Sequence, residues 1–396
     1  MLPCFSQTAA VLLVVGALTA CGANLPGSGP TTSEVTAAAA PIASGETRFA
    51  LVDVDLGVVA KLESWTAASM QGTFGRQPAF STPTIGVGDS VEVMIWEAAG
   101  GALFSASDQS GSGSRSAVIP AQAVGAGGAI TVPYAGRVTV AGRTSQQVEQ
   151  AIMQALTGKA IEPQALVTVT KNIANTVTVV GDVTGGARVP LTTRGDRILD
   201  IVASAGGTQA PAHETFVTLV RDGRSVRIPM QAILNDPTEN VYVRPGDVIT
   251  LAREVQTFTA AGATGKNAVV AFDGLGITLD QAIARAGGLM DNRADPAGVF
   301  VIRYERPEEY DRLGLKRPHG GTIAQVPVVY RVNMAETSGF FLAQRFPVRN
   351  KDIVYVSNAP ATELQKAIDI MLPFFGAGTT TVSAGSTVKA SASTPK

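Results

Sequence analysis

The chain has 396 residues, a length typical of roughly two to four domains, and 45% of them are hydrophobic against 16% charged. Its net charge of −1 excludes a strongly basic surface that would hold nucleic acid by neutralising phosphates. The 42 glycines and 22 prolines favour many turns and short strands. Both cysteines lie near the N-terminus, and His213 and His319 are far apart without cysteine neighbours, so we expect no disulfide framework, metal or cofactor.

The N-terminal segment predicts a secretory signal peptide and a lipid attachment. Residues 9–20 form an apolar run that is too short for a membrane span of about 20 residues but fits a secretory signal. The run ends in Leu-Thr-Ala-Cys-Gly, which resembles a bacterial lipobox. We therefore expect residues 1–20 to be a lipoprotein signal peptide and Cys21 to carry the lipid. The alternative is an ordinary cleaved signal peptide with an incidental cysteine.

A tether is predicted after the anchor. Residues 22–46 are rich in alanine, threonine, serine, glycine and proline, a composition typical of a flexible linker. We assign residues 21–79 to this tether and an N-terminal segment that joins it to the folded body.

Residues 80–173 predict a β-rich domain. Gly88 and Asp89 mark a turn, after which Val91, Val93 and Ile95 alternate with other side chains, as in a strand with two different faces. Residues 98–128 are rich in glycine, serine and alanine, and we interpret them as a loop with only brief structure, around residues 118–120.

A helix is predicted near the end of this domain. Thr144 and Gln147 form a capping box, a stripe of apolar residues follows at helical spacing, and Gly158 ends the helix. The stripe consists of Val148, Ile152 and Leu156.

The rest of the body repeats one order of elements. Residues 174–254 and 255–358 each contain a short helix closed by Ala-Gly-Gly, then a strand, and finally a turn, an aspartate and a strand. Glycine pairs suit a left-handed helix end. The corresponding segments are 198–207 and 279–288 for the helices, 216–221 and 299–304 for the strands, and 241–251 and 346–356 for the endings.

Taken in order, these segments resemble the bacterial outer-membrane polysaccharide export family of the Wza, BexD and CtrA type. The resemblance covers roughly residues 80–360, and it identifies residues 80–173 as a polysaccharide export domain and the two repeats as soluble-ligand-binding β-grasp (SLBB) domains. It implies an α+β fold and a homo-oligomeric ring, an octamer in well-known members. It further implies that the ring conducts capsular or exopolysaccharide from the periplasm to the cell surface, with an inner-membrane co-polymerase or ABC-type export partner below.

A C-terminal amphipathic helix is predicted over residues 359–375, followed by a disordered tail, 376–396. The helix suits lipid on one face and water on the other, but residues 362–372 span only about 16 Å against a hydrocarbon core about 30 Å thick. The alternative is a helix that packs on its own domain or on a neighbouring subunit. The membrane-facing candidates are Leu364, Ile368, Met371, Leu372 and Phe375.

No catalytic constellation is apparent, so we expect a conduit rather than an enzyme. Glu308 and Glu309 are adjacent, which is more typical of a solvated run than of an acid–base pair. Trp96 and Tyr134 suit a core or subunit contact better than sugar stacking. The prediction is a lipid-anchored outer-membrane exporter with most of its mass in the periplasm. The main alternative is a periplasmic glycan- or peptidoglycan-binding lipoprotein that forms no channel.

Overall fold

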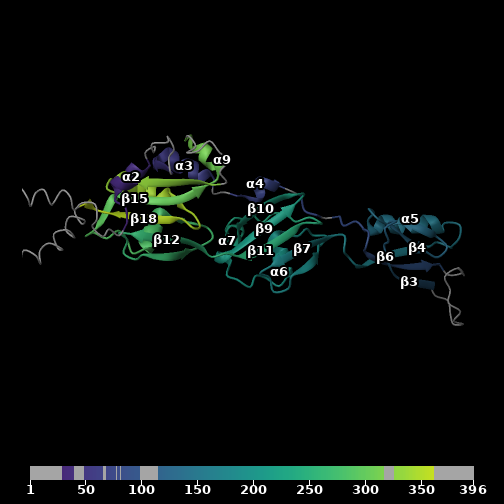
Figure 1. Ribbon diagram of the computed structural model, residues 1–396. Helices are drawn as coiled ribbons and strands as arrows, with labels where there is room; N and C mark the ends of the chain where they lie inside the picture. The colour runs from purple at the N-terminus through teal and green to yellow at the C-terminus, as the bar shows by residue number, and fades with distance from the viewer. Residues whose placement is uncertain are drawn as a thin grey trace, which may run out of the picture. The chain divides into compact units, whose positions relative to one another are not determined.

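The computed structural model divides the chain into two compact units, described here one at a time (Figure 1). Unit 1 comprises Met1–Thr66, Thr257–Phe272 and Gly276–Lys396, and unit 2 comprises Ala67–Gln256 and Asp273–Leu275. The structure describes residues 29–39, 49–65, 68–76, 78–80, 82–98, 115–315 and 325–360.

The export domain lies in unit 2 and is built around strand β2 (Ser90–Glu97). This strand pairs antiparallel with β3 (Arg115–Ala123) on one side and with β6 (Gln164–Lys171) on the other. Its residues alternate between half-buried and buried. Val91, Val93 and Ile95 form the buried face, which confirms the predicted strand.

One helix and a hairpin complete the core of this domain. Strands β4 (Ala129–Val132) and β5 (Gly136–Thr139) form the hairpin. Helix α5 (Ser145–Leu156) begins at the predicted capping box of Thr144 and ends just before Gly158. The predicted stripe of this helix is fully buried, as the capping and spacing indicated.

The brief structure predicted around residues 118–120 is longer than expected. Residues Arg115–Ala123 form β3, a nine-residue strand hydrogen-bonded along the whole of β2. Because β3 lies at the edge of its sheet, most of its side chains need not be apolar, and its alanine, serine and glutamine content concealed it.

The first β-grasp domain, also in unit 2, has a five-stranded sheet in the order β10-β9-β11-β7-β8. Its core contains the predicted helix α6 (Ile198–Ser204), a shorter helix α7 (Met230–Asn235) and helix α4 (Met70–Phe74) from far upstream. Its strands are β7 (Thr176–Gly181), β8 (Ala187–Pro190), β9 (Thr215–Arg221), β10 (Arg224–Pro229) and β11 (Val248–Arg253).

The second β-grasp domain, in unit 1, repeats this topology with one extra strand. Its sheet order is β1-β16-β15-β18-β12-β13, so each strand of the first sheet has a counterpart, and β1 is added at one edge. Helices α3 (Leu56–Trp65), α8 (Leu279–Arg285), α9 (Pro307–Leu313) and α10 (Thr337–Arg345) accompany it. The strands are β1 (Ala50–Asp53), β12 (Gln256–Gly262), β13 (Ala268–Phe272), β15 (Ala294–Glu305), β16 (Val326–Val332) and β18 (Ile353–Asn358), with β14 (Ile277–Thr278) and β17 (Pro347–Val348) forming a small separate pair.

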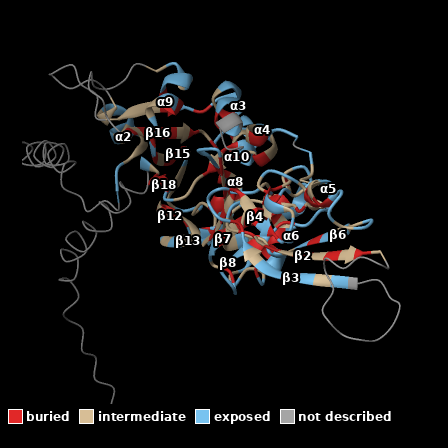
Figure 2. Cartoon of the chain, turned by 90° about the vertical axis from the view of Figure 1, so that its right-hand side faces the viewer, coloured by how far each residue is buried: buried red, intermediate tan, exposed pale blue. Residues whose placement is uncertain are grey.

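Each of the three domains has its own cluster of buried apolar residues (Figure 2). The export domain and the two β-grasp domains therefore agree with the predicted α+β fold. The predicted C-terminal helix, residues 359–375, lies outside the described residues apart from its first two positions.

The N-terminal segment differs from the expected tether. Within residues 22–46, Thr32–Ala38 form helix α2, which begins at a capping box made by Thr31 and Glu34. The hydroxyl of Thr32 donates to Asp295 Oδ2 at 2.6 Å and lies 2.7 Å from Ser357 Oγ. The small polar residues that suggested a linker thus cap a helix and bind it to the second β-grasp domain.

Strand β1 extends this attachment. It pairs parallel with β16, and Ala50 lies opposite Val328. Residues upstream of the export domain therefore complete both β-grasp domains, which composition did not reveal because β1 is only four residues long.

One glycine recurs at the end of the strand that pairs parallel with the last strand of each β-grasp domain. Gly181 and Gly262 have φ of 99° and 90°. A Cβ at Gly262 would lie 2.0 Å from the carbonyl oxygen of Val356, and one at Gly181 would lie 1.9 Å from that of Leu251. Both positions therefore require glycine for its backbone angle and for its lack of a side chain.

Replacing Gly262 by alanine tests this requirement. We expect Gly262→Ala to lower the free energy of unfolding of the second β-grasp domain by about 3 kcal/mol or more, since β18 must move. Gly276→Ala is the matched control, because φ is 99° there but the space around a Cβ is open; it should cost only about 1 kcal/mol. Urea unfolding of both variants gives the comparison, and equal losses would contradict the steric argument.

Candidate functional site

The residues predicted to attach the protein to the membrane lie outside the described residues. This holds for Cys21 and for the candidates on the C-terminal helix: Leu364, Ile368, Met371, Leu372 and Phe375. Their predicted roles stay predictions. None of the helices in the described part of the chain has the length and apolar character needed to cross a bilayer.

Two other predicted positions are described. Trp96 is half-buried on β2, whereas Tyr134 is 55% exposed in the turn between β4 and β5, so a core role does not hold for Tyr134. His213 is exposed, as expected for a surface residue, and His319 lies outside the described residues.

One arrangement of buried polar groups recurs in the described residues: a buried aspartate follows a turn and directly precedes a strand. We name this arrangement the aspartate junction. The export domain has the simplest one. Asp89 is fully buried, and its Oδ2 accepts from the backbone N–H of Gly86 at 2.8 Å. Its Oδ1 accepts from the N–H groups of Ile173 and Ala174 at 2.7 and 2.9 Å. This carboxylate joins the start of β2 to the segment that leaves β6.

The first β-grasp domain replaces part of that backbone network by an arginine. Arg221 donates from Nε to Asp247 Oδ1 at 2.9 Å and from Nη2 to Oδ2 at 2.6 Å, a two-pronged ion pair whose side chains are 4% and 2% exposed. Nη2 also donates to the carbonyl of Tyr242, and the N–H of Arg244 donates to Asp247 Oδ2. The pair therefore ties β9 to the turn before β11.

The second β-grasp domain repeats this geometry almost atom for atom. Arg303 donates from Nε to Asp352 Oδ1 at 2.8 Å, from Nη2 to Oδ2 at 2.6 Å, and from Nη2 to the carbonyl of Pro347 at 2.8 Å. The N–H of Arg349 donates to Asp352 Oδ2 at 2.7 Å. The two domains thus share one junction as well as one topology.

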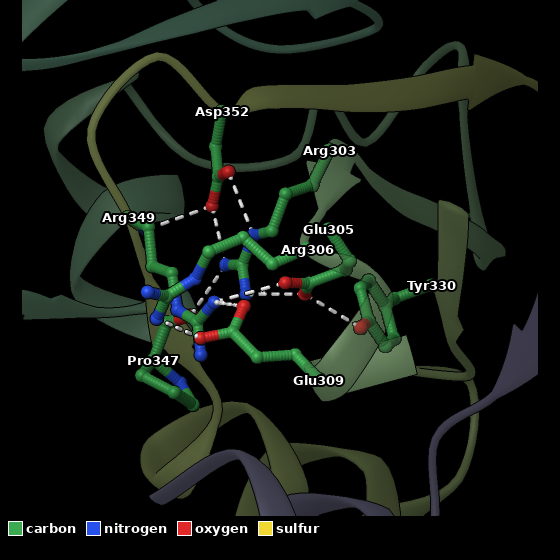
Figure 3. Close-up of polar contacts among 8 residues, drawn as sticks. All are labelled: Arg303, Glu305, Arg306, Glu309, Tyr330, Pro347, Arg349 and Asp352. Atoms are coloured by element: carbon green, nitrogen blue, oxygen red, sulfur yellow. Dashed lines mark hydrogen bonds and ion pairs between the residues drawn. The ribbon is translucent and has the colours of Figure 1, made fainter. Parts of the chain in front are cut away.

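Further charges surround the junction of the second domain (Figure 3). Tyr330 donates its hydroxyl hydrogen to Glu305 Oε1 at 2.7 Å. Arg349 donates from Nη1 to Glu305 at 3.0 Å and to Glu309 at 3.1 Å, and Arg306 donates to Glu309 at 2.5 Å. Helix α9, which carries Glu309, is thereby fixed to the sheet. The predicted solvated run is wrong for Glu309, which is buried, whereas Glu308 is exposed.

Burial and neighbouring charges shift several pKa values in this cluster. Burial raises the pKa of Glu305, with Arg303 acting in the opposite direction. Burial alone would also raise the pKa of Glu309, but hydrogen bonds with Glu305 and Arg306 lower it to about 2. Burial, and then Glu305, raise the pKa of Tyr330. Glu305 is therefore the carboxyl that takes a proton first, while Glu309 stays ionised.

The sequence contained a signal for these junctions that we did not interpret. Arg221 follows Val217 and Leu219 on the buried face of β9, and Arg303 follows Val299 and Val301 in the same way on β15. An arginine on the buried face of two equivalent strands, with an aspartate after a turn in each repeat, indicates a buried ion pair.

Such buried and mutually neutralised groups hold strands together and are closed to a substrate. Within the described ranges, no group of three or more His, Cys, Asp and Glu side chains is placed to hold a metal ion.

Comparison with known proteins defines the class. Residues 77–170 match the family described as "Polysaccharide biosynthesis/export protein", and residues 256–356 match the SLBB domain. The chain is 38% identical to the capsule polysaccharide export outer membrane protein CtrA of Neisseria meningitidis serogroup A, over 91% of this chain and 93% of that protein. It is 36% identical to the capsule polysaccharide export protein BexD of Haemophilus influenzae, over the same shares.

The chain belongs to the family of bacterial polysaccharide export proteins. A more distant relative is the Vi polysaccharide export protein VexA/TviF of Salmonella typhi, 30% identical over 63% of this chain and 68% of that protein. The family confirms the predicted role in polysaccharide export and the predicted location at the outer membrane.

Breaking one junction tests what it contributes. Asp352→Ala removes the two-pronged partner of Arg303 and leaves the buried guanidinium only its longer contact with Glu305 Oε1 at 3.3 Å. We expect it to lower the free energy of unfolding by about 3 kcal/mol. The double variant Arg303→Met/Asp352→Leu removes both charges and should recover at least half of that loss. Asp53→Ala, which breaks the exposed pair with Arg331, is the control and should cost at most about 1 kcal/mol. Urea unfolding that shows equal losses in the single and double variants would contradict the role of the buried charge that has lost Asp352.

The low pKa of Glu309 predicts a pH dependence. A carboxyl whose pKa is lower in the folded state stabilises the fold above its unfolded pKa, and this contribution is lost as the pH falls toward the folded value of about 2. Glu309→Gln should therefore lower the free energy of unfolding by about 2 kcal/mol at pH 7, and the difference should shrink below about pH 4.5. Unfolding at pH 7, 5 and 3.5 measures it, with Glu308→Gln as the exposed neighbour control. A difference that is constant with pH would refute the assignment.

Proposed function

We propose that the chain forms a homo-oligomeric ring in the outer membrane, an octamer in the simplest case, through which capsular polysaccharide passes from the periplasm to the cell surface. The observation that carries the proposal is the 38% identity along 93% of a capsule polysaccharide export outer membrane protein. Because the match runs through nearly the whole chain, it supports a shared overall role and not only a shared domain. An inner-membrane co-polymerase or ABC-type exporter would deliver the polymer.

Open sheet edges support assembly into a ring. Strands β8 and β10 lie at the edges of the first β-grasp sheet, and β1 and β13 lie at the edges of the second. Strand β13 carries Val269, which is 68% exposed. Edge strands with exposed apolar side chains tend to pair with another chain, so these edges are suited to contacts between subunits.

A lipid at Cys21 and the helix over residues 362–375 would hold the ring at the membrane. Only seven residues separate Cys21 from Gly29, where the described chain begins. Because an extended residue spans at most about 3.6 Å, a lipid on Cys21 would lie within roughly 30 Å of Gly29, three residues before helix α2. The last described residue, Pro360, follows β18 of the same domain, so both proposed attachments start from the second β-grasp domain.

We propose a passive conduit rather than an enzyme. The carboxylates of Glu305, Glu309 and Asp352, which lie at the junction of the second β-grasp domain, are buried and paired with arginines. Such carboxylates are not available to transfer protons to a glycosidic bond.

The mass of the detergent-extracted mature protein tests the ring. We expect light scattering and negative-stain imaging to show a closed ring of several copies. A stable monomer over physiological concentrations would overturn the channel and leave a glycan-binding lipoprotein as the better account.

A Cys21→Ser variant separates anchoring from assembly. It should lack the mass of the lipid in intact-protein mass spectrometry and should fractionate less tightly with membranes, while its β-grasp domains unfold as in the wild type. A lipid mass that persists in this variant would disprove attachment at Cys21.

A further inference from the structure

A cleft in unit 2 has features that the fold does not require. It has a volume of about 630 Å³ and lies in the first β-grasp domain, beside the end of α4 and the start of α6. The lining groups that matter here are Gln71, Arg76, Arg197, Asn240 and Tyr242.

The cleft is positively charged within a chain whose net charge is −1. Among the described residues that line it, Arg76 and Arg197 are the charged ones. No carboxylate of the described residues forms an ion pair with either guanidinium. The nearby Glu239 is engaged elsewhere, because its oxygens accept from the Ser69 hydroxyl at 2.5 Å and from the N–H of Met70 at 2.6 Å. Two unneutralised cations therefore share one concave surface.

Contacts within the protein hold Arg197 in position without a ligand. The guanidinium carbon of Arg197 lies 4.3 Å from the centre of the Tyr242 ring, and Nη1 donates to the carbonyl of Asn240 at 2.8 Å. The side-chain oxygen of Asn240 accepts from the N–H of Leu199 at 3.1 Å, so its NH₂ group remains the donor for a ligand. A positioned guanidinium loses less freedom on binding, which favours recognition of a planar or tetrahedral anion.

We propose that this cleft binds an acidic sugar unit, one that carries a carboxylate or phosphate, of the transported polysaccharide. Arg76 and Arg197 would take the anionic group, and the amides of Asn240 and Gln71 would donate to neighbouring hydroxyl oxygens. The inference rests on the proposed function, because it names a class of polymer for the same conduit. Since the cleft is open and the charges are screened by salt, binding is weak, with a Kd on the order of 1 mM, which suits a polymer that must move on.

Titration of the full-length, detergent-extracted protein tests the proposal. The probes are a tetramer of galacturonic acid, a neutral tetramer of glucose and inorganic phosphate, each followed by isothermal calorimetry or ligand-observed NMR. We expect the acidic tetramer to bind at least about tenfold more tightly than the neutral one, and the difference to shrink in high salt.

Variants locate the site. Arg76→Gln and Arg197→Gln should each weaken binding of the acidic tetramer about tenfold. Arg197→Lys, which keeps the charge but not the planar fork, should fall between these variants and the wild type. Arg194→Gln removes the same charge from an exposed position outside the cleft and should leave binding unchanged. Because the Arg76 side chain makes no hydrogen bond or ion pair to the described residues, its variant should unfold at the wild-type temperature.

Three results would overturn the inference: equal affinity for the acidic and neutral tetramers, equal weakening by Arg194→Gln, or inorganic phosphate binding as tightly as the sugar, which would indicate a site for any small anion. Light scattering on the same samples keeps the two proposals apart. An intact ring that does not bind the acidic sugar would refute the proposed sugar site alone. A monomer that still binds the acidic sugar would refute the proposed ring alone.

Discussion

A carboxylate buried at the start of a strand is the constraint on which each domain depends. Removing a charge from water costs several kcal/mol unless hydrogen bonds or an opposite charge compensate, so Asp89, Asp247 and Asp352 each dictate what must surround them. In the export domain the compensation comes from three backbone N–H groups. In both β-grasp domains it comes from an arginine of a neighbouring strand. The hydrogen-bonding needs of the carboxylate therefore fix the register of the strand that carries the arginine and the shape of the turn before the aspartate.

The two β-grasp domains have kept this pair and diverged around it. In the first, Arg221 also lies 5.2 Å from the ring of Phe74 on α4, so the N-terminal helix covers the junction. In the second, Tyr330 and further acidic and basic groups continue the network to α9. The same buried pair thus fixes a different accessory helix in each domain, and the segments that distinguish the domains are those the junction holds.

The sequence predicted the elements whose signals are local. The alternation of Val91, Val93 and Ile95 and the capping box at Thr144 each involve neighbouring residues, and both are present. The glycine pairs end their helices with left-handed residues, as expected. The hairpin between β9 and β10 also has a local signal, which we did not interpret: Asp222 and Gly223, both at positive φ, form the Asp-Gly pair typical of a two-residue turn.

The features that the sequence did not predict depend on contacts between residues far apart in the chain. Strand β3 gains its partner from β2, and β1 gains its partner from β16, so neither needs a strong pattern of its own. The cleft of Arg76 and Arg197 brings together residues more than a hundred positions apart, and no spacing rule indicates that proximity. The membrane attachments, by contrast, have a clear sequence signature at Cys21 but lie beyond the described residues.

The attachment of β1 sets the order in which the chain can acquire its structure. Asp53 pairs with Arg331 across 278 positions, and Thr32 meets Ser357 across 325. Because a chain emerges with its N-terminus first, the earliest segments must wait until nearly the last strand has been made. Contacts of such long sequence separation form slowly, since the intervening loop must close first. The second β-grasp domain is therefore the last to complete, and until β16 is made the backbone of β1 lacks its partner strand.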